Sequence, residues 1–167
     1  MDVLHFMKEE YSAIRSELPK IAPSDVSKSL SGPSLKRFMV RLELVVRVGA
    51  DLILPEVIDS VQGAAAVAML AEDQLKALGR IVAAFRKSSE LSDQKRSEVF
   101  RKVSAHIEQM EKAILPLVRE LLPTAVREDI GEIALDYRED FSAGLSRGRS
   151  GAASKSSSGK ATATISA

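Results

Sequence analysis

The chain has no cysteine and no tryptophan, and His5 and His106 are the only histidines among its 167 residues. Without cysteine it can form neither disulfides nor thiolate metal sites, and it has no cysteine nucleophile. Two histidines do not suffice for a histidine-rich metal centre, and neither has a serine or aspartate partner at the spacing of a catalytic triad. The sequence also has no glycine-rich phosphate loop. We therefore predict that the protein is not an enzyme.

Long apolar runs are missing as well. No stretch approaches the roughly 20 apolar residues that a membrane-spanning helix needs. Met1–Glu10 lacks the basic region and the apolar stretch of a signal peptide. We therefore expect a soluble, cytoplasmic protein that does not bind to a membrane.

Charge is nearly balanced over the whole chain but unevenly distributed. There are 24 Lys and Arg against 23 Asp and Glu, a formal charge of +1. Residues 142–167 are rich in Ser, Ala, Gly and Thr and contain four basic residues and no acidic one, which leaves residues 1–141 with a charge of −3. Such a composition buries too little apolar surface to offset the cost of ordering it. We predict a domain over residues 1–141 and a disordered basic tail over 142–167, too weakly basic and lacking the aromatics to make nucleic acid the expected partner.

Apolar residues recur at spacings of three and four along almost all of residues 1–141, the pattern of amphipathic helices. We expect Ser34 and Ser92 to cap the second and fourth of these helices. Four long stripes joined by short connections predict an all-α fold, an antiparallel up-and-down four-helix bundle with a short fifth helix. The stripes are Leu4, Met7, Tyr11, Ile14 and Leu18; Leu35, Phe38, Leu42, Val45, Gly49 and Leu52; Ala68, Ala71, Leu75, Leu78, Val82 and Phe85; Val99, Val103, His106, Met110, Ile114, Leu117 and Leu121; and Val126, Ile130, Ile133 and Tyr137.

The second and fourth predicted helices resemble each other at an offset of 61 residues. Val45–Val57 and His106–Val118 both contain Ile-Leu-Pro followed by a Val two places on, so that Pro55 matches Pro116. An uncompensated proline inside a helix costs about 3 kcal/mol. Two of them at equivalent positions therefore favour a shared architecture of the two halves over a coincidence between leucine-rich helices.

The helix order, the spacings and the two late prolines resemble those of the hemerythrin-like (HHE cation-binding) domains over about residues 2–141. That resemblance implies a four-helix bundle around a non-haem di-iron centre. In the family, a histidine lies ten residues before each late proline, and a carboxylate follows it by four or five residues. The fourth predicted helix matches this pattern, because His106 lies ten residues before Pro116 and Glu111 lies five residues after His106.

The other ligand positions implied by the resemblance hold different residues. Tyr11 occupies the position of the first-helix histidine, and Glu72 that of a histidine in the third helix. In the second helix, Val45 and Gly49 stand in place of the histidine and the glutamate. The di-iron ligand set is therefore degenerate, and one wall of the site becomes apolar.

Two hypotheses follow, and the sequence leaves both open. In the first, the chain binds no cofactor, His106 and Glu111 form a buried hydrogen-bonded pair together with Tyr11 or Glu72, and the protein is a structural, sensing or protein-interaction module. A cavity lined by Val45, Gly49 and Met110 would then suit a small apolar ligand. In the second, a carboxylate-rich site binds iron or another divalent cation, with the candidate ligands His106, Glu111, Glu72 and Tyr11, or Glu10 in place of Tyr11. His5 is expected at the surface or near a helix end.

Overall fold

The computed structural model describes residues 1–23, 25–60 and 65–153, and every regular element in these ranges is helical. The all-α prediction is therefore confirmed. None of the described helices is both long and apolar enough to span a bilayer. The elements are α1 (Val3–Glu17), the 3-10 turns η1 (Leu18–Lys20) and η2 (Val26–Lys28), α2 (Gly32–Arg47), η3 (Val48–Ile53), α3 (Leu54–Ser60), α4 (Ala65–Ser88), α5 (Asp93–Gln109), η5 (Met110–Ile114), α6 (Leu115–Leu121) and α7 (Thr124–Ala153).

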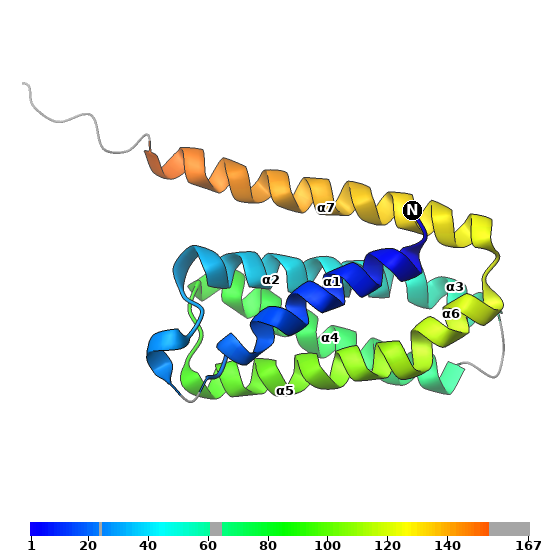
Figure 1. Ribbon diagram of the computed structural model, residues 1–167, viewed down its shortest axis with the longest axis horizontal. Coiled ribbons are helices and arrows are strands. Elements are labelled where there is room, and N and C mark those ends of the chain that lie inside the picture. Colours follow the sequence, from blue (N-terminus) through cyan, green and yellow to red (C-terminus); the bar gives the residue numbers. More distant parts are fainter. Residues whose placement is uncertain (24, 61–64, 154–167) are drawn as a thin grey trace, which may run out of the picture.

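The helices lie side by side along the long axis of the molecule (Figure 1). α2 packs on α4, α4 packs on α5, and α1 lies against α2. α7 runs along one side of this group and packs mainly on α1 and, less extensively, on α2. The predicted stripes form most of the core, because the majority of their residues are buried. The stripe residues that are half-buried or exposed are Leu4 in the first stripe, Leu52 in the second, Leu117 and Leu121 in the fourth, and Val126, Ile133 and Tyr137 in the last.

Both late prolines follow a π-helical segment. η3 ends two residues before Pro55 and η5 ends two residues before Pro116. Each proline therefore lies in the first turn of a new α-helical segment, α3 or α6, where its missing N–H leaves no intrahelical hydrogen bond unmade. The helix accommodates each proline through a widened turn, at equivalent places in the two halves of the chain, which agrees with the sequence repeat.

The π-helical segments shift the buried face by one residue. A π turn spans one residue more than an α turn, so the positions that face the core fall one residue later beyond it. Leu52 was expected in the core but is half-buried, whereas Ile53 is fully buried. In the same way Leu117 is half-buried and Val118 is fully buried. The prediction continued the α-helical spacing through η3 and η5 without a shift. It is therefore wrong by one position after each of these segments.

The last helix is not short. α7 has 30 residues and crosses the predicted boundary between residues 141 and 142 without a break. No proline follows Pro123 to interrupt it, and Leu145 continues the apolar spacing of Tyr137 and Phe141. Ile133, expected in the core, is 43% exposed, while Ala134 is fully buried. The remainder of the predicted tail, 154–167, lies outside the described residues.

The first turn of α1 is fixed to α7 and to the end of α6. Asp2 caps α1 by accepting a hydrogen bond from the N–H of Leu4 at 2.8 Å, and its other oxygen accepts one from Arg127 Nε at 3.0 Å. Arg127 also donates to the carbonyl of Arg119 at 3.1 Å. The chain approaches Gly131 so closely that a Cβ there would lie 1.7 Å from the carbonyl oxygen of Met1.

One of the two predicted caps is confirmed. Ser92 caps α5, its hydroxyl accepting a hydrogen bond from the N–H of Lys95 at 3.2 Å. Ser34 is not a cap, because α2 begins at Gly32 and Ser31 is the residue before it. Pro33 within the first turn has the backbone angle that a helix start requires, and this moves the start of α2 ahead of Ser34.

The shifted stripe can be tested with neighbouring substitutions. We expect Val118→Ala to lower the free energy of unfolding by about 2 kcal/mol, because it removes two buried methyl groups and leaves a cavity. Leu117→Ala removes more atoms but should cost less than about 1 kcal/mol, since Leu117 is only half-buried. Urea unfolding followed by circular dichroism measures both. A larger cost at Leu117 than at Val118 would contradict the shifted face.

The close approach at Gly131 gives a second test, with Gly79 in α4 as its control. Gly131→Ala should destabilise the protein, because the new methyl group collides with the backbone of Met1 and displaces the start of α1. At Gly79 an added Cβ meets only a side-chain atom of Val46 at 4.0 Å. Gly79→Ala should therefore stabilise the helix by up to about 1 kcal/mol. Thermal unfolding of both variants would refute this account if they shifted the midpoint equally.

Candidate functional site

The centre of the core contains a hydrogen bond between α1 and α5. The Tyr11 hydroxyl lies 3.0 Å from His106 Nε2. The two rings meet edge to face, with centroids 5.7 Å apart, and both side chains are fully buried. The structure thus brings together two of the four candidate metal ligands, Tyr11 and His106, and these two side chains hydrogen-bond to each other.

Burial keeps both groups of this pair uncharged. Burial lowers the pKa of His106 to about 4, because the low-dielectric interior disfavours the imidazolium. Burial also raises the pKa of Tyr11 well above its usual value, and the nearby Glu111 carboxylate raises it further. A neutral imidazole therefore shares a hydrogen bond with a neutral phenol at neutral pH. His106 Nδ1, the second ring nitrogen, has no hydrogen-bond partner among the described residues.

Neither carboxylate candidate forms a hydrogen bond with this pair; both are paired with cations instead. Glu111 binds the guanidinium of Arg15 on α1 through both oxygens, one of them 3.0 Å from Arg15 Nη1. Glu72 pairs instead with Lys76, one turn along α4, at 2.8 Å. The expected buried pair of His106 with Glu111 is therefore wrong, because a cation on the neighbouring helix draws Glu111 toward the surface.

The wall contributed by α2 is apolar and filled. Val45 is fully buried, and Leu75 of α4 packs so tightly on Gly49 that an added Cβ would lie 3.2 Å from its Cδ1. Val45 and Met110, expected to line a cavity with Gly49, are fully buried, and Leu75 occupies the space beside Gly49.

These residues do not fit a di-iron centre. Within residues 1–23, 25–60 and 65–153, no three His, Cys, Asp or Glu side chains are grouped so as to hold a metal ion. His106 Nε2 is already bonded to Tyr11, and both carboxylates are paired with cations. Glu10, the alternative ligand on α1, lies near Arg41 and Arg138, at 3.4 Å from each. His5 lies at the surface as expected, 3.1 Å from Glu9.

Protein-family models, curated proteins and solved structures contain no match to this chain. The candidate sites therefore depend on the geometry alone.

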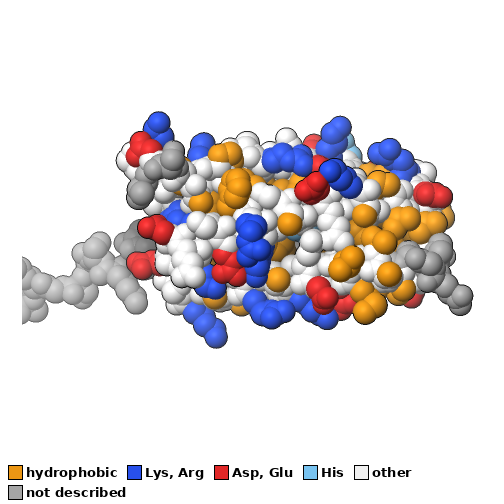
Figure 2. All heavy atoms as spheres, turned by 90° about the horizontal axis from the view of Figure 1, so that it is seen from below, with side chains coloured by type: hydrophobic (Ala, Val, Ile, Leu, Met, Phe, Trp, Pro, Cys, Tyr) orange, Lys and Arg blue, Asp and Glu red, His pale blue; other side chains and the backbone are white. Residues whose placement is uncertain are grey.

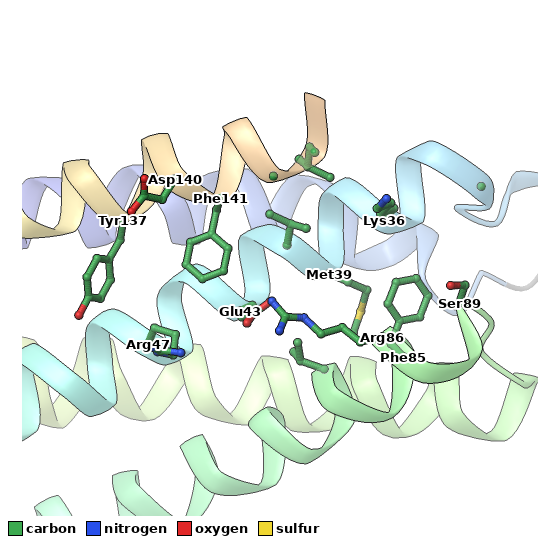
Figure 3. Close-up of a pocket in the computed structure, with 15 residues that line it drawn as sticks. Lys36, Met39, Glu43, Arg47, Phe85, Arg86, Ser89, Tyr137, Asp140 and Phe141 are labelled. Atoms are coloured by element: carbon green, nitrogen blue, oxygen red, sulfur yellow. The ribbon is translucent and has the colours of Figure 1, made fainter. Parts of the chain in front are cut away.

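A groove of about 770 Å³ separates the second half of α7 from α2 and the end of α4. In Figure 3, Phe141 projects from α7 into this space, with Met39 of α2 and Phe85 of α4 on its other side. Most of its side-chain lining is apolar or aromatic. The lining residues are Gly32, Lys36, Met39, Val40, Glu43, Arg47, Val82, Phe85, Arg86, Ser89, Tyr137, Asp140, Phe141, Gly144 and Leu145.

The floor of the groove carries a buried charge. Glu43 is only 9% exposed and accepts a hydrogen bond from Arg86 Nη2 at 2.6 Å. A buried carboxylate needs such a partner to remain ionised. Arg47, further along α2, binds Asp51 at 2.8 Å, whereas Lys36 forms no ion pair with any described residue.

The sequence did not reveal this groove, although part of its signal was present. Tyr137, Phe141 and Leu145 are spaced by four residues and continue beyond the predicted end of the last helix. Glu43 follows the core residue Leu42 but does not itself belong to an apolar stripe. The groove also depends on where α7 lies relative to α2, which the sequence pattern does not encode.

Apolar side chains also gather at one end of the molecule, where α3 ends and α4 begins (Figure 2). Ile58 of α3 is 44% exposed, and Met69 and Leu70 of α4 are 63% and 61% exposed. These residues form a surface patch, whereas the α7 groove is hollowed and combines apolar walls with charges. The groove is therefore the better candidate for a binding site.

The buried histidine makes stability depend on pH. An unfolded histidine titrates near pH 6.5, whereas folded His106 does so near 4. Between these values the unfolded chain binds more protons, so stability falls as the pH decreases from about 6.5 to about 4. We expect His106 to contribute about 3 kcal/mol to this loss.

The pH dependence is measured by urea unfolding at intervals between pH 7.5 and 4. His106→Gln should flatten this part of the curve. His5→Gln is the control, because the His5 side chain is 63% exposed, and it should leave the curve close to that of the original chain. Identical slopes in all three proteins would show that His106 is not buried in its neutral form.

Proposed function

We propose that the chain is a hemerythrin-like, antiparallel four-helix bundle whose di-iron centre is replaced by a packed core, and that it is a non-enzymatic binding module. The matched π segments before Pro55 and Pro116 support the shared architecture. The arrangement in Figure 1, in which successive long helices reverse direction at their connections, supports the bundle topology. The Tyr11–His106 contact and the packing of Leu75 on Gly49 support the loss of the metal centre.

The observation that carries the binding role is the groove beside α7. Its volume of about 770 Å³ lies within the range of about 300–1,000 Å³ that is usual for small-molecule sites. Apolar walls with a few polar groups are also typical of such sites. The former metal region, in contrast, is filled by side chains, so the groove replaces the interior as the place where a ligand binds.

The attachment of α7 suggests how binding has an effect. α7 is fixed to α1 at the level where the groove begins, because Arg138, the residue after the lining residue Tyr137, lies 3.4 Å from the buried Glu10 and 5.4 Å from the centre of the Phe6 ring. Beyond Tyr137, α7 faces the body across the groove. A ligand in the groove would contact both α7 and the body of the bundle. It would thereby stabilise the second half of α7 in its position. A sensing module requires such a change of conformational equilibrium on binding.

A neutral apolar dye, N-phenyl-1-naphthylamine, tests the groove. We expect saturable fluorescence enhancement with one dye per chain. Gly144→Phe should abolish it, because Gly144 lines the groove and an added Cβ meets no atom within 4 Å, so a larger side chain can begin there and compete with the dye for the space. Ala143→Phe is the matched control, since the neighbouring Ala143 is exposed and does not line the groove.

Two results would contradict the proposal. Equal dye binding by Gly144→Phe and Ala143→Phe would place the site elsewhere, and no saturable binding would refute the binding role. Stoichiometric iron in the purified protein that is lost on replacing both His106 and Glu111 by Ala would support the metal-binding hypothesis instead.

A further inference from the structure

We propose that the α7 groove binds a single-chain amphiphile with an anionic head, such as a fatty-acid carboxylate, with the head at Lys36 and the chain between α7 and α2. This inference rests on the proposed binding function and names its ligand class. It follows from the distribution of charge along the groove, the shape of the apolar walls and the position of α7.

The charges that line the groove are unevenly placed along it. The lining includes three cations, Lys36, Arg47 and Arg86, and the two carboxylates Glu43 and Asp140. Arg86 is paired with Glu43, and Arg47 with Asp51 outside the lining. Lys36 and Asp140 are the lining charges without an ion pair among the described residues, and they lie toward opposite ends of the groove (Figure 3). An anionic head is therefore favoured at the Lys36 end.

Among the three cations, Lys36 is the one available to a ligand. Arg86 is held by Glu43 at 2.6 Å and Arg47 by Asp51 at 2.8 Å. Lys36 has an exposed side chain on α2 and no ion pair within the described part of the chain. An anionic head would form an ion pair with Lys36 at the solvent-facing edge of the groove. At that edge neither the head nor the lysine has to lose all of its water.

The apolar side chains continue from Lys36 along the groove. Figure 3 shows Lys36 near one end with Met39 and Phe85, Phe141 further along, and Tyr137 at the opposite end. An elongated apolar chain can follow this row while its head remains at Lys36. Glu43 on the floor of the groove is paired with Arg86. The apolar chain of the ligand therefore does not meet an unpaired carboxylate.

The position of α7 argues against a partner helix as the occupant. A helix docked on α2 and α4 would need the place that α7 already takes across the groove (Figures 1 and 3). What remains is a space of about 770 Å³, whereas a helix has a diameter of about 10 Å with its side chains. A thin, flexible chain fits this space without moving α7.

The test compares three ligands that share a ten-carbon chain and differ in the head: decanoate, 1-decanol and decyltrimethylammonium. Each is titrated against the protein loaded with N-phenyl-1-naphthylamine, below its own aggregation concentration. We expect decanoate to displace the dye at about fivefold lower concentration than 1-decanol, the upper range for one partly exposed ion pair. Decyltrimethylammonium should be the weakest of the three.

Substitutions then assign the preference to Lys36. Lys36→Met should remove the difference between decanoate and 1-decanol, with each displacement referred to the dye binding of the same variant. Lys87→Met is the matched control, because Lys87 is an exposed lysine of α4 that does not line the groove. It should preserve the preference for decanoate.

The outcomes separate the two proposals. Equal displacement by all three ligands would contradict the proposal of an anionic ligand. A preference for decanoate that survives in Lys36→Met would contradict it too. Both results would still be consistent with an apolar binding site. A preference for decyltrimethylammonium overturns the anionic ligand as well. Displacement by an acidic amphipathic peptide at lower concentration than decanoate would identify a protein partner instead. If the dye itself does not bind, the proposed function fails.

Discussion

The hydrogen bond between Tyr11 and His106 lies where α1 meets α5, and the core around it is organised to keep both groups neutral. A charged imidazole at this place would lose its hydration without gaining a carboxylate partner, because Glu111 is engaged by Arg15. The remaining positions of the region are therefore apolar: Val45 is buried and Leu75 packs on Gly49. Once the centre is closed in this way, an opening suited to a ligand is left at the periphery, beside α7.

Periodicity predicted the all-α fold and most of the core because it reports the face of each helix directly. It missed the one-residue shift at Ile53 and Val118, since the width of a π turn depends on how the backbone accommodates the following proline. The start of α2 was misplaced for a related reason, because Pro33 allows the helix to begin before Ser34. These errors are all local consequences of proline.

The candidate site was harder to predict, for reasons of tertiary structure. Tyr11 and His106 were both predicted on the core-facing stripes of their helices, and they do meet. The sequence could not show that Arg15 would draw Glu111 to the surface, because that contact joins residues 96 positions apart. The groove depends similarly on α7, whose length was underestimated when its Gly and Ser content was taken as a sign of disorder.

α7 is held both by ion pairs to α1 and by Ile130 and Ala134, which belong to the apolar core. Asp2–Arg127 and Glu9–Arg138 are ionic and partly open to solvent, whereas α2, α4 and α5 are joined mainly by apolar packing. Mobile ions screen exposed charge pairs but leave apolar contacts largely unaffected. Added salt therefore weakens the ionic part of the docking of α7, while the burial of Ile130 and Ala134 is left largely unaffected.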